Sequence, residues 1–254
     1  MKVQLFDTCA TWTATGSSTA RNAQPGSLAE TVKFIFQNEN FAVVDKPHGS
    51  LTVPSRMGDQ EHRPCLGLQL QNELGKRVWP VHRLDFEVSG IVLFALTAEA
   101  HRAASIWFEN HSIRKVYEAW SSSISPSTPT PPLDARQHWK SCLVRGKKRS
   151  FEADYGKPAE TFATATESMT RFGQNVTVWR LEPITGRSHQ LRYELRKHDQ
   201  PIVGDTLYGS PVTLTEHPDT IALRAIELRL PDEARLNWRL PPEFSVAGLA
   251  ATLI

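Results

Sequence analysis

The chain has 254 residues, of which 40% are hydrophobic and 22% charged, and its formal net charge is +2 at pH 7. This composition is typical of a folded protein with a sizeable core and excludes a disordered chain, while the small charge neither requires nor excludes a nucleic-acid partner. No apolar run approaches the roughly 20 residues of a membrane helix, and the N-terminus lacks the apolar core of a secretory signal, so we expect no membrane association. Three widely spaced cysteines, Cys9, Cys65 and Cys142, form no CxxC pair, which indicates reduced thiols in a cytoplasmic protein and no structural metal.

The first third of the chain predicts a strand and a short helix. Residues 1–32 are rich in Thr, Ser and Ala without a clear period, and we interpret them as an N-terminal extension before a domain over residues 33–254. Residues 41–44 predict a strand, and residues 45–49 a turn, because Pro fixes φ and Gly permits unusual backbone angles. Residues 65–74 are compatible with a short helix, although their leucines alternate more closely than a helical stripe requires.

The middle of the chain has the clearest pattern. Residues 91–96 are continuously apolar, which predicts a strand buried on both faces, directly after a tight turn at Ser89–Gly90. Thr97 can cap a helix over residues 98–110, where apolar side chains recur at helical spacing. A second strand is predicted over residues 115–120.

The rest of the chain predicts further strands and one helix. Residues 121–132 form a loop rich in Ser, Thr and Pro. The other predicted elements are, in order, strands over 162–167 and 176–181 joined by a turn at 173–175, a helix over 187–197 and a strand over 221–230. Because strands outnumber helices and most apparent neighbours are sequential, we predict an α+β fold with a mainly antiparallel mixed β-sheet and flanking helices.

An arginine and a carboxylate, Arg83 and Asp85, stand two residues apart just before the buried strand. Such an Asp can serve as nucleophile or base, and an arginine within about 4–6 Å keeps it ionised against the effect of burial. We expect Arg192 to be that partner, because its segment is rich in arginine and anchored by a helix. From this motif alone, the alternative is a surface ion pair of little energetic value.

Tyr117 lies on a predicted strand, where the ordinary role of a tyrosine is half-buried packing. The functional alternative is an aromatic wall that stacks on an extruded base, with its hydroxyl available for proton transfer. A long cation such as Arg83 is suited to filling the space that an extruded base leaves.

Positive charge is clustered at two places. Residues 145–149 include Arg145, Lys147, Lys148 and Arg149, and a second group includes Arg187 and Arg192. Clustered positive charge supplies affinity for phosphates through counterion release, although the first cluster is equally compatible with a solvated loop.

Other chemistry lacks its motif in this sequence. Residues 82–85 superficially resemble a kinase catalytic loop, but their order differs and no Gly-rich loop or Asp-Phe-Gly follows. A phosphate-binding GxxxxGK[ST] loop, an HExxH metal motif and a GxSxG elbow are all absent from the sequence. We therefore expect no cofactor and no metal.

Several segments together resemble the RluA-type RNA pseudouridine synthases, which isomerise uridine to pseudouridine in structured RNA. The segments that carry the resemblance are Val81–Asp85 with Ser89–Gly90, Thr185–Arg192, Pro201–Asp205 with Tyr208–Gly209, Val43–Gly49 and Tyr155–Thr161. The resemblance covers about residues 34–230 and is closest to short single-domain members without an S4 domain.

The resemblance implies a role for each candidate residue. It makes Asp85 the catalytic aspartate, Tyr117 the tyrosine beside the target base and Arg192 the basic partner of Asp85. It makes Arg83 the residue that replaces the flipped nucleotide. It also implies a cofactor-free reaction, an RNA partner (rRNA or tRNA) that Arg187 and the 145–149 cluster help to bind, and a monomeric enzyme.

Two residues depart from the family pattern. Val88 stands where a Thr usually precedes Ser-Gly, which removes a hydroxyl and with it a local hydrogen bond. Glu194 stands where the family usually carries His, and we expect its negative charge to weaken RNA contacts.

Two other functions compete with this interpretation. A non-catalytic RNA-binding relative would keep the fold, but pure binding does not require Asp85 among phosphates, where a carboxylate repels. A glycosidic hydrolase normally uses two carboxylates, and no second carboxylate stands out in the sequence.

Overall fold

The computed structural model describes residues 31–55, 60–125, 130–216 and 218–253. The chain divides into two units, and the second, Val32–Ile254, contains nearly all of the described residues. The predicted extension over residues 1–32 lies outside the described residues except for Thr31 and Val32, so it remains a prediction.

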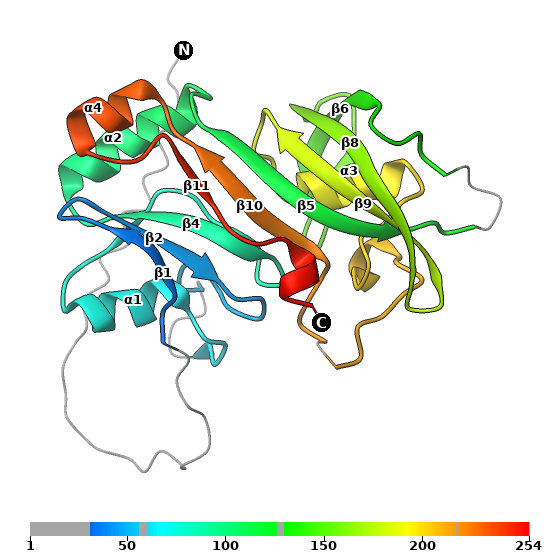
Figure 1. Cartoon of the computed structure of the whole chain (residues 1–254), viewed down its shortest axis with the longest axis horizontal. Coiled ribbons are helices and arrows are strands. Elements are labelled where there is room, and N and C mark those ends of the chain that lie inside the picture. The colour runs from blue at the N-terminus through cyan, green and yellow to red at the C-terminus, as the bar shows by residue number, and fades with distance from the viewer. Residues whose placement is uncertain (1–30, 56–59, 126–129, 217, 254) are drawn as a thin grey trace, which may run out of the picture. The chain divides into compact units, whose positions relative to one another are not determined.

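Over the described ranges, eleven strands form one mixed sheet (Figure 1). Along the main path, its order is β1 (Phe34–Gln37), β2 (Phe41–Lys46), β4 (Ser89–Ala95), β10 (Leu223–Arg229), β5 (Arg114–Ser122), β9 (Gln174–Pro183), β8 (Lys157–Arg171), β6 (Arg136–Arg145) and β7 (Ser150–Glu152). The short strands β3 (Trp79–Pro80) and β11 (Glu243–Ser245) pair with β4 and β10. All of these pairs are antiparallel except β4 with β10, so the predicted α+β fold with a mainly antiparallel mixed sheet is confirmed.

Helices cover both faces of the sheet. The α-helices are α1 (Leu66–Leu74), α2 (Ala98–Glu109), α3 (Gln190–Lys197) and α4 (Asp232–Trp238), and the 3₁₀ helices include η2 (Thr206–Tyr208) and η3 (Leu249–Ala251). Alternate residues of β4 enter two separate apolar clusters: Val92 and Phe94 pack with α1 and α3, and Ile91 and Leu93 pack with α2 and α4. The strand is thus buried on both faces, as its unbroken apolar sequence predicts.

Several helix boundaries follow from local sequence. The Thr97 hydroxyl accepts a hydrogen bond from the Ala100 amide at 3.2 Å, which confirms the predicted cap of α2. The helix predicted from residue 187 instead begins at Gln190, because His189 adopts a left-handed backbone with φ of 50°. Its predicted apolar stripe, Leu191 and Leu195, is buried.

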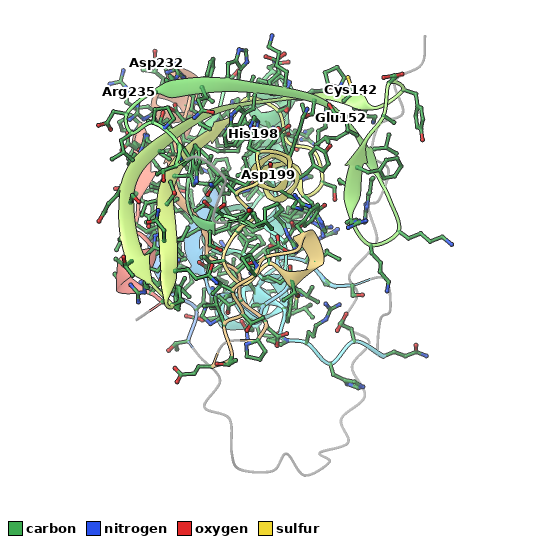
Figure 2. All side chains as sticks on the ribbon, turned by 90° about the vertical axis from the view of Figure 1, so that its right-hand side faces the viewer. Cys142, Glu152, His198, Asp199, Asp232 and Arg235 are labelled. Carbon is green, nitrogen blue, oxygen red and sulfur yellow. The ribbon has the colours of Figure 1, made fainter. Side chains whose placement is uncertain are left out.

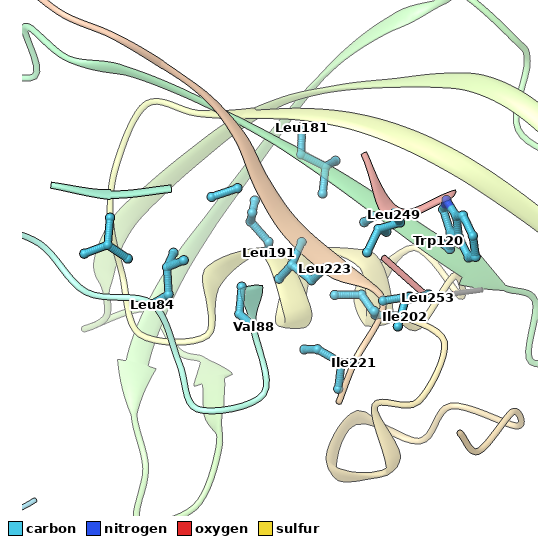
Figure 3. Close-up of a cluster of buried hydrophobic side chains, with 14 of the residues drawn as sticks. Leu84, Val88, Trp120, Leu181, Leu191, Ile202, Ile221, Leu223, Leu249 and Leu253 are labelled. Atoms are coloured by element: carbon cyan, nitrogen blue, oxygen red, sulfur yellow. The ribbon is translucent and has the colours of Figure 1, made fainter. Parts of the chain in front are cut away.

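The segment around Asp85 is anchored on both sides by apolar side chains. Leu84 and Val88 point into the same core as Leu191 of α3 and Leu223 of β10 (Figure 3). Val88 is only 3% exposed, so its methyl groups pack where a threonine would have to place a hydroxyl. This packing accounts for the departure from the family pattern at Val88.

The predicted turn at Ser89–Gly90 is wrong, because both residues belong to β4. Gly90 has φ of 112° and lies opposite Ala225 of β10, and a Cβ atom there would overlap the Ala225 carbonyl. The glycine therefore permits the close parallel pairing of β4 with β10.

A buried lysine holds the loop between Asp85 and β4. The Lys46 ammonium at the end of β2 donates hydrogen bonds to the carbonyls of Pro47 (2.8 Å), Phe86 (3.3 Å) and Val88 (2.7 Å). Burial lowers the pKa of Lys46 to about 7, although the charges of Asp85 and Glu87 oppose that shift.

Replacing Gly90 by alanine will test the close approach of β4 to β10. We expect Gly90→Ala to lower the free energy of unfolding by more than ~3 kcal/mol, because the backbone of β10 at Ala225 must move away from the added methyl group. Gly75→Ala is the matched control: Gly75 also has positive φ, but nothing lies within 4 Å of its added Cβ. We expect that control to lose only about 1–2 kcal/mol in urea unfolding. Equal losses in both variants would contradict the packing described here.

Replacing Lys46 by methionine will change how stability depends on pH. The unfolded lysine keeps its proton up to a pKa of 10.5 and the folded one releases it at about 7, so stability rises with pH across that window. We expect the rise, measured by urea unfolding at pH 7 and pH 10, to be smaller in Lys46→Met. Part of the rise should remain in the variant, because burial also lowers the pKa of Lys115 to about 8.

Lys140→Met is the control for this titration, because Lys140 on β6 is exposed and should keep the wild-type rise. An unchanged rise in Lys46→Met would show that Lys46 stays charged in the folded protein.

Candidate active site

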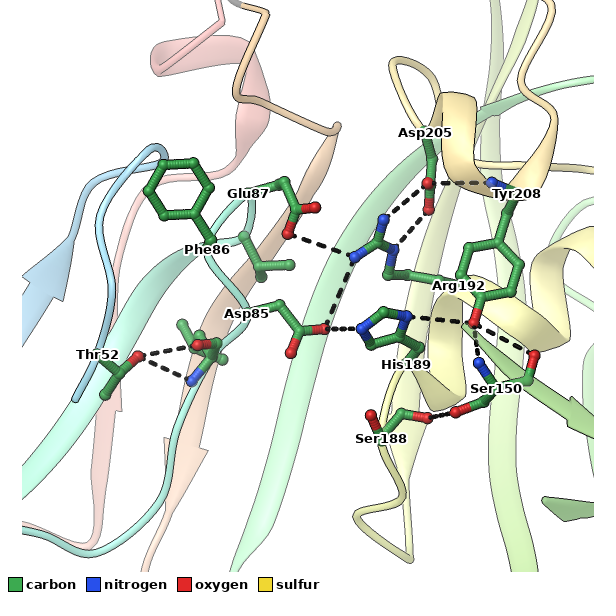
Figure 4. A network of polar contacts seen from close by, with 12 residues as sticks. Thr52, Asp85, Phe86, Glu87, Ser150, Ser188, His189, Arg192, Asp205 and Tyr208 are labelled. Atoms are coloured by element: carbon green, nitrogen blue, oxygen red, sulfur yellow. Dashed lines mark hydrogen bonds and ion pairs between the residues drawn. The ribbon is translucent and has the colours of Figure 1, made fainter. Parts of the chain in front are cut away.

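Asp85 lies in the loop immediately before β4, and its side chain is 28% exposed. In Figure 4 the carboxylate faces the guanidinium of Arg192 and the imidazole of His189. Its Oδ2 atom lies 3.9 Å from Nη1 of Arg192 and 3.8 Å from Nε2 of His189. The sequence-predicted partners Asp85 and Arg192 are therefore neighbours, although at a distance longer than a hydrogen bond.

The principal partner of Arg192 is Asp205, which stood out in the sequence only as the end of the segment Pro201–Asp205. Nε and Nη2 of Arg192 donate to the two carboxylate oxygens of Asp205 at 2.7 and 2.8 Å, and the two side chains are 2% and 1% exposed. Burial alone would lower the pKa of Arg192, but the hydrogen bonds and charge of Asp205 outweigh it and raise the pKa. Because this fork uses two of the three guanidinium nitrogens, Nη1 is the one that faces Asp85.

A second carboxylate shares that nitrogen. Oε2 of Glu87 lies 3.4 Å from Nη1 of Arg192, on the same loop as Asp85 (Figure 4). Nothing in the sequence marked Glu87 as part of the site, because its proximity to Arg192 depends on how α3 packs against the loop.

Tyr117 comes from β5 and lies in the same row of the sheet as Gly90. Gly90 pairs with Ala225 of β10, and Ala225 pairs with Tyr117. Burial raises the pKa of the Tyr117 hydroxyl, and the negative charge of Asp85 raises it further. The phenol is therefore protonated near the Asp85 carboxylate and packs against the same core as α3.

Arg83 is exposed between two residues that are fixed in place. On one side, Nε2 of His82 accepts a hydrogen bond from the Leu93 amide at 3.0 Å. On the other, Thr52 bonds both the amide and the carbonyl of Leu84, at 3.1 and 2.9 Å. The backbone of Arg83 is thus held two residues from Asp85 while its side chain remains in solvent.

The predicted basic cluster forms the tip of the β6–β7 hairpin. Lys147, Lys148 and Arg149 are exposed there. Arg187 lies just before α3, and its Nε donates to the carbonyl of Pro158 at 2.8 Å. Arg187 adjoins the His189–Arg192 segment in sequence. The hairpin contacts the chain just before the same segment through Ser150, which follows the basic cluster.

His189, Tyr208 and Ser150 were missed as site residues. The Tyr208 hydroxyl accepts from the Ser150 amide at 2.8 Å and lies 3.2 Å from Nδ1 of His189 (Figure 4). Burial lowers the pKa of His189, and Arg192 adds to that effect while Asp85 opposes it. The segments Thr185–Arg192 and Tyr208–Gly209 contain His189 and Tyr208, but nothing in the sequence marked Ser150.

Glu194 lies away from the candidate site. It follows Arg192 by two residues on α3, which directs the two side chains to different sides of the helix, and it is fully buried. Its pKa is raised by burial. The expectation that Glu194 weakens RNA contacts by its charge is therefore not supported by its position.

The end of α3 packs against the edge of the sheet that bears the hairpin. His198 stacks on Trp139 of β6 with ring centroids 4.3 Å apart, and Lys197 bonds Glu152 of β7 at 2.9 Å. Figure 2 labels His198 and Asp199 at this end of α3, with Cys142 and Glu152 on the neighbouring strands.

Among the described residues, His, Cys, Asp and Glu form no group of three or more that could hold a metal ion. Within the same ranges, no helix combines the length and the apolar character needed to cross a membrane.

Comparison with known proteins identifies the fold and the family. Residues 40–197 match the family described as RNA pseudouridylate synthase. A solved human protein, RNA Pseudouridylate Synthase Domain Containing 1, superposes with a TM-score of 0.64 over 91% of this chain and 97% of its own, at 23% identity, which shows the shared fold.

Curated relatives cover most of the chain. The dual-specificity RNA pseudouridine synthase RluA of Vibrio vulnificus is 33% identical over 77% of this chain and 76% of its own length. The proteins of the same name from Salmonella typhi and Escherichia coli K12 are 32% and 34% identical, over 83% and 70% of this chain and 93% and 77% of their own. The chain therefore belongs to the RNA pseudouridylate synthase family and is an RluA-type member of it.

Proposed function

We propose that this RNA pseudouridine synthase uses Asp85 to initiate cleavage of the glycosidic bond of a uridine that has been flipped out of structured RNA. The observation that carries the proposal is the meeting of Asp85 with the buried cation Arg192 and with Tyr117, from three separate segments of the chain. The detached uracil then rotates and is rejoined to the sugar through C5, which loses its proton, while N1, released from the sugar, gains a proton. Because product and substrate are isomers, the reaction consumes no co-reactant, and the proposal needs no cofactor.

The neighbouring residues support distinct parts of this reaction. Arg192 places one N–H and its positive charge beside the Asp85 carboxylate. Tyr117 provides an aromatic surface for the flipped base, and its protonated hydroxyl can donate to it. Arg83, held by its neighbours but free at its side chain, occupies the gap that the flipped nucleotide leaves.

The RNA contacts that we propose lie on the β6–β7 hairpin and beside α3. Lys147, Lys148 and Arg149 supply phosphate affinity, and Arg187 adds to it just before α3. The relatives are named dual-specificity enzymes, and we propose that this chain likewise modifies rRNA, tRNA or both.

Further features of the proposal concern the whole molecule. We propose that residues 33–254 form the catalytic domain and that the enzyme acts as a monomer in the cytoplasm. The free thiols of Cys65 and Cys142 support a reducing compartment.

The two competing functions are weaker. A binding-only relative would not need a carboxylate beside Arg192 at the site, since negative charge repels phosphate. Glu87 does supply a second carboxylate, as a hydrolase would require, but family membership favours isomerisation.

Asparagine at position 85 will separate catalysis from binding. We expect Asp85→Asn to lower pseudouridine formation more than ~10³-fold on tRNA and rRNA transcripts, because the amide cannot act as nucleophile or base. RNA affinity should be retained or rise slightly, since one negative charge is removed. Glu99→Gln, which changes an exposed carboxylate on α2, should leave both quantities unchanged. Normal pseudouridine formation by Asp85→Asn would exclude Asp85 as the catalytic aspartate.

Removing the hairpin charges will test the RNA surface. We expect the triple variant Lys147→Ala, Lys148→Ala, Arg149→Ala to bind RNA about tenfold more weakly, with a smaller dependence of log K on log salt and an unchanged kcat. A control that removes three exposed charges elsewhere, Lys76→Ala, Arg102→Ala, Arg235→Ala, should bind as the wild type does. Equal weakening in both triples would assign the effect to net charge rather than to the hairpin.

A further inference from the structure

His189 has an unusual backbone at a position that directs its ring to Asp85. It precedes α3 with φ of 50°, in the left-handed region that few residues other than glycine adopt. Such strained conformations concentrate at functional sites. In Figure 4 the imidazole lies between Asp85 and Tyr208, with one nitrogen toward each.

The donor and acceptor roles in the contacts between Ser150, Tyr208 and His189 follow from the first of these residues, which lies in the β6–β7 hairpin. The Ser150 amide can only donate, so at 2.8 Å the Tyr208 oxygen must accept from it. The Tyr208 proton then has two acceptors in reach, Nδ1 of His189 at 3.2 Å and the Ser150 carbonyl at 3.4 Å. The shorter contact is the one to His189.

The charge state of His189 follows from the groups that face it. Burial and Arg192 lower its pKa, while Asp85 and Glu87 from the loop and Asp205 before η2 raise it, and the net shift is downward. The ring is therefore neutral at pH 7 and carries one N–H. A carboxylate can only accept, so the proton is favoured on Nε2, which faces Asp85, and Nδ1 is left to accept from Tyr208.

We propose that His189 is a positioning residue for the reaction, a neutral imidazole whose Nε2–H steadies Oδ2 of Asp85, and that Tyr208 fixes this tautomer. The proposal rests on the proposed function of Asp85. The 3.8 Å contact is longer than a hydrogen bond, and catalytic hydrogen bonds are often long in the free enzyme and shorten when substrate is bound. Arg192 and His189 both hold Oδ2, which leaves Oδ1 to meet the uridine.

This arrangement connects the RNA-binding hairpin to the catalytic carboxylate. Ser150, which starts the chain of donors, directly follows Arg149 of the basic cluster. Its hydroxyl also donates to the carbonyl of Ser188 at 2.6 Å, beside His189. The hairpin and the start of α3 are thus fixed to each other at the residue that orients Asp85.

The tautomer can be read without RNA and without turnover. Long-range ¹H–¹⁵N spectra of the full-length labelled protein at pH 7 report which imidazole nitrogen carries the proton, and His189→Gln assigns the signal. We expect Nε2–H in the wild type and a mixture of tautomers in Tyr208→Phe. Protonation of Nδ1 alone, or an imidazolium, in the wild-type protein would overturn the proposal.

Kinetics on an RNA transcript test the role of the same contact. We expect Tyr208→Phe to lower kcat about tenfold with little change in KM, because the donor to Asp85 is weakened. In a His189→Gln background the same substitution should have no further effect, since the glutamine amide donates from the position of Nε2 without help from Tyr208. Losses that multiply in the double variant would overturn the proposal.

Two controls make these outcomes specific. Tyr193→Phe removes a tyrosine hydroxyl from α3. That hydroxyl donates to Glu152 and not to His189, so the variant should keep the wild-type kcat. Thermal unfolding shows whether each variant is folded. If the wild type forms no pseudouridine, the proposed function fails, while the spectra still decide the tautomer.

Discussion

The buried ion pair between Arg192 and Asp205 is the interaction on which the site depends. Two nearly inaccessible charges are stable together only because the fork of Arg192 is matched by both oxygens of Asp205. Removing either partner would leave a buried charge alone, at a cost of roughly 3–5 kcal/mol. The pair fixes the guanidinium so that Nη1 faces Asp85, and Asp205 also caps η2, which carries Tyr208. The contact between Arg192 and Asp205 thus orients both Arg192 and Tyr208.

The sheet brings the other components to that pair. β10 lies between β4 and β5, so the loop that ends at β4 and the tyrosine on β5 are separated by a single strand. Gly90 makes this spacing possible, and Lys46 ties the loop to the end of β2. Leu84 and Val88 bury their side chains beside Leu191, which holds the loop against α3. The positions of the proposed catalytic groups are therefore set by backbone pairing and core packing rather than by flexible surface segments.

Much of this organisation could be predicted from the sequence. The strand at residues 91–96, the helix capped by Thr97 and the α+β class followed from local periodicity and capping, which depend on neighbouring residues only. The partner of Arg192 could not, because nothing in a sequence distinguishes Asp205 from Asp85 as the nearer carboxylate until α3 and η2 are packed. The start of α3 was placed three residues early for a related reason: His189 adopts its left-handed backbone in a tertiary setting. We expected the charge of Glu194 to weaken RNA contacts, but the side chain is buried, and that burial depends on how α3 packs in the fold.

This chain belongs to a family of pseudouridine synthases, and we propose that it forms pseudouridine in cellular RNA through Asp85. The most direct measurement is a pseudouridine map, by carbodiimide-stop sequencing, of RNA from cells with and without the gene. We expect one or a few rRNA or tRNA sites to disappear without the gene and to return with the wild-type chain but not with Asp85→Asn. A map that is unchanged by loss of the gene would contradict it.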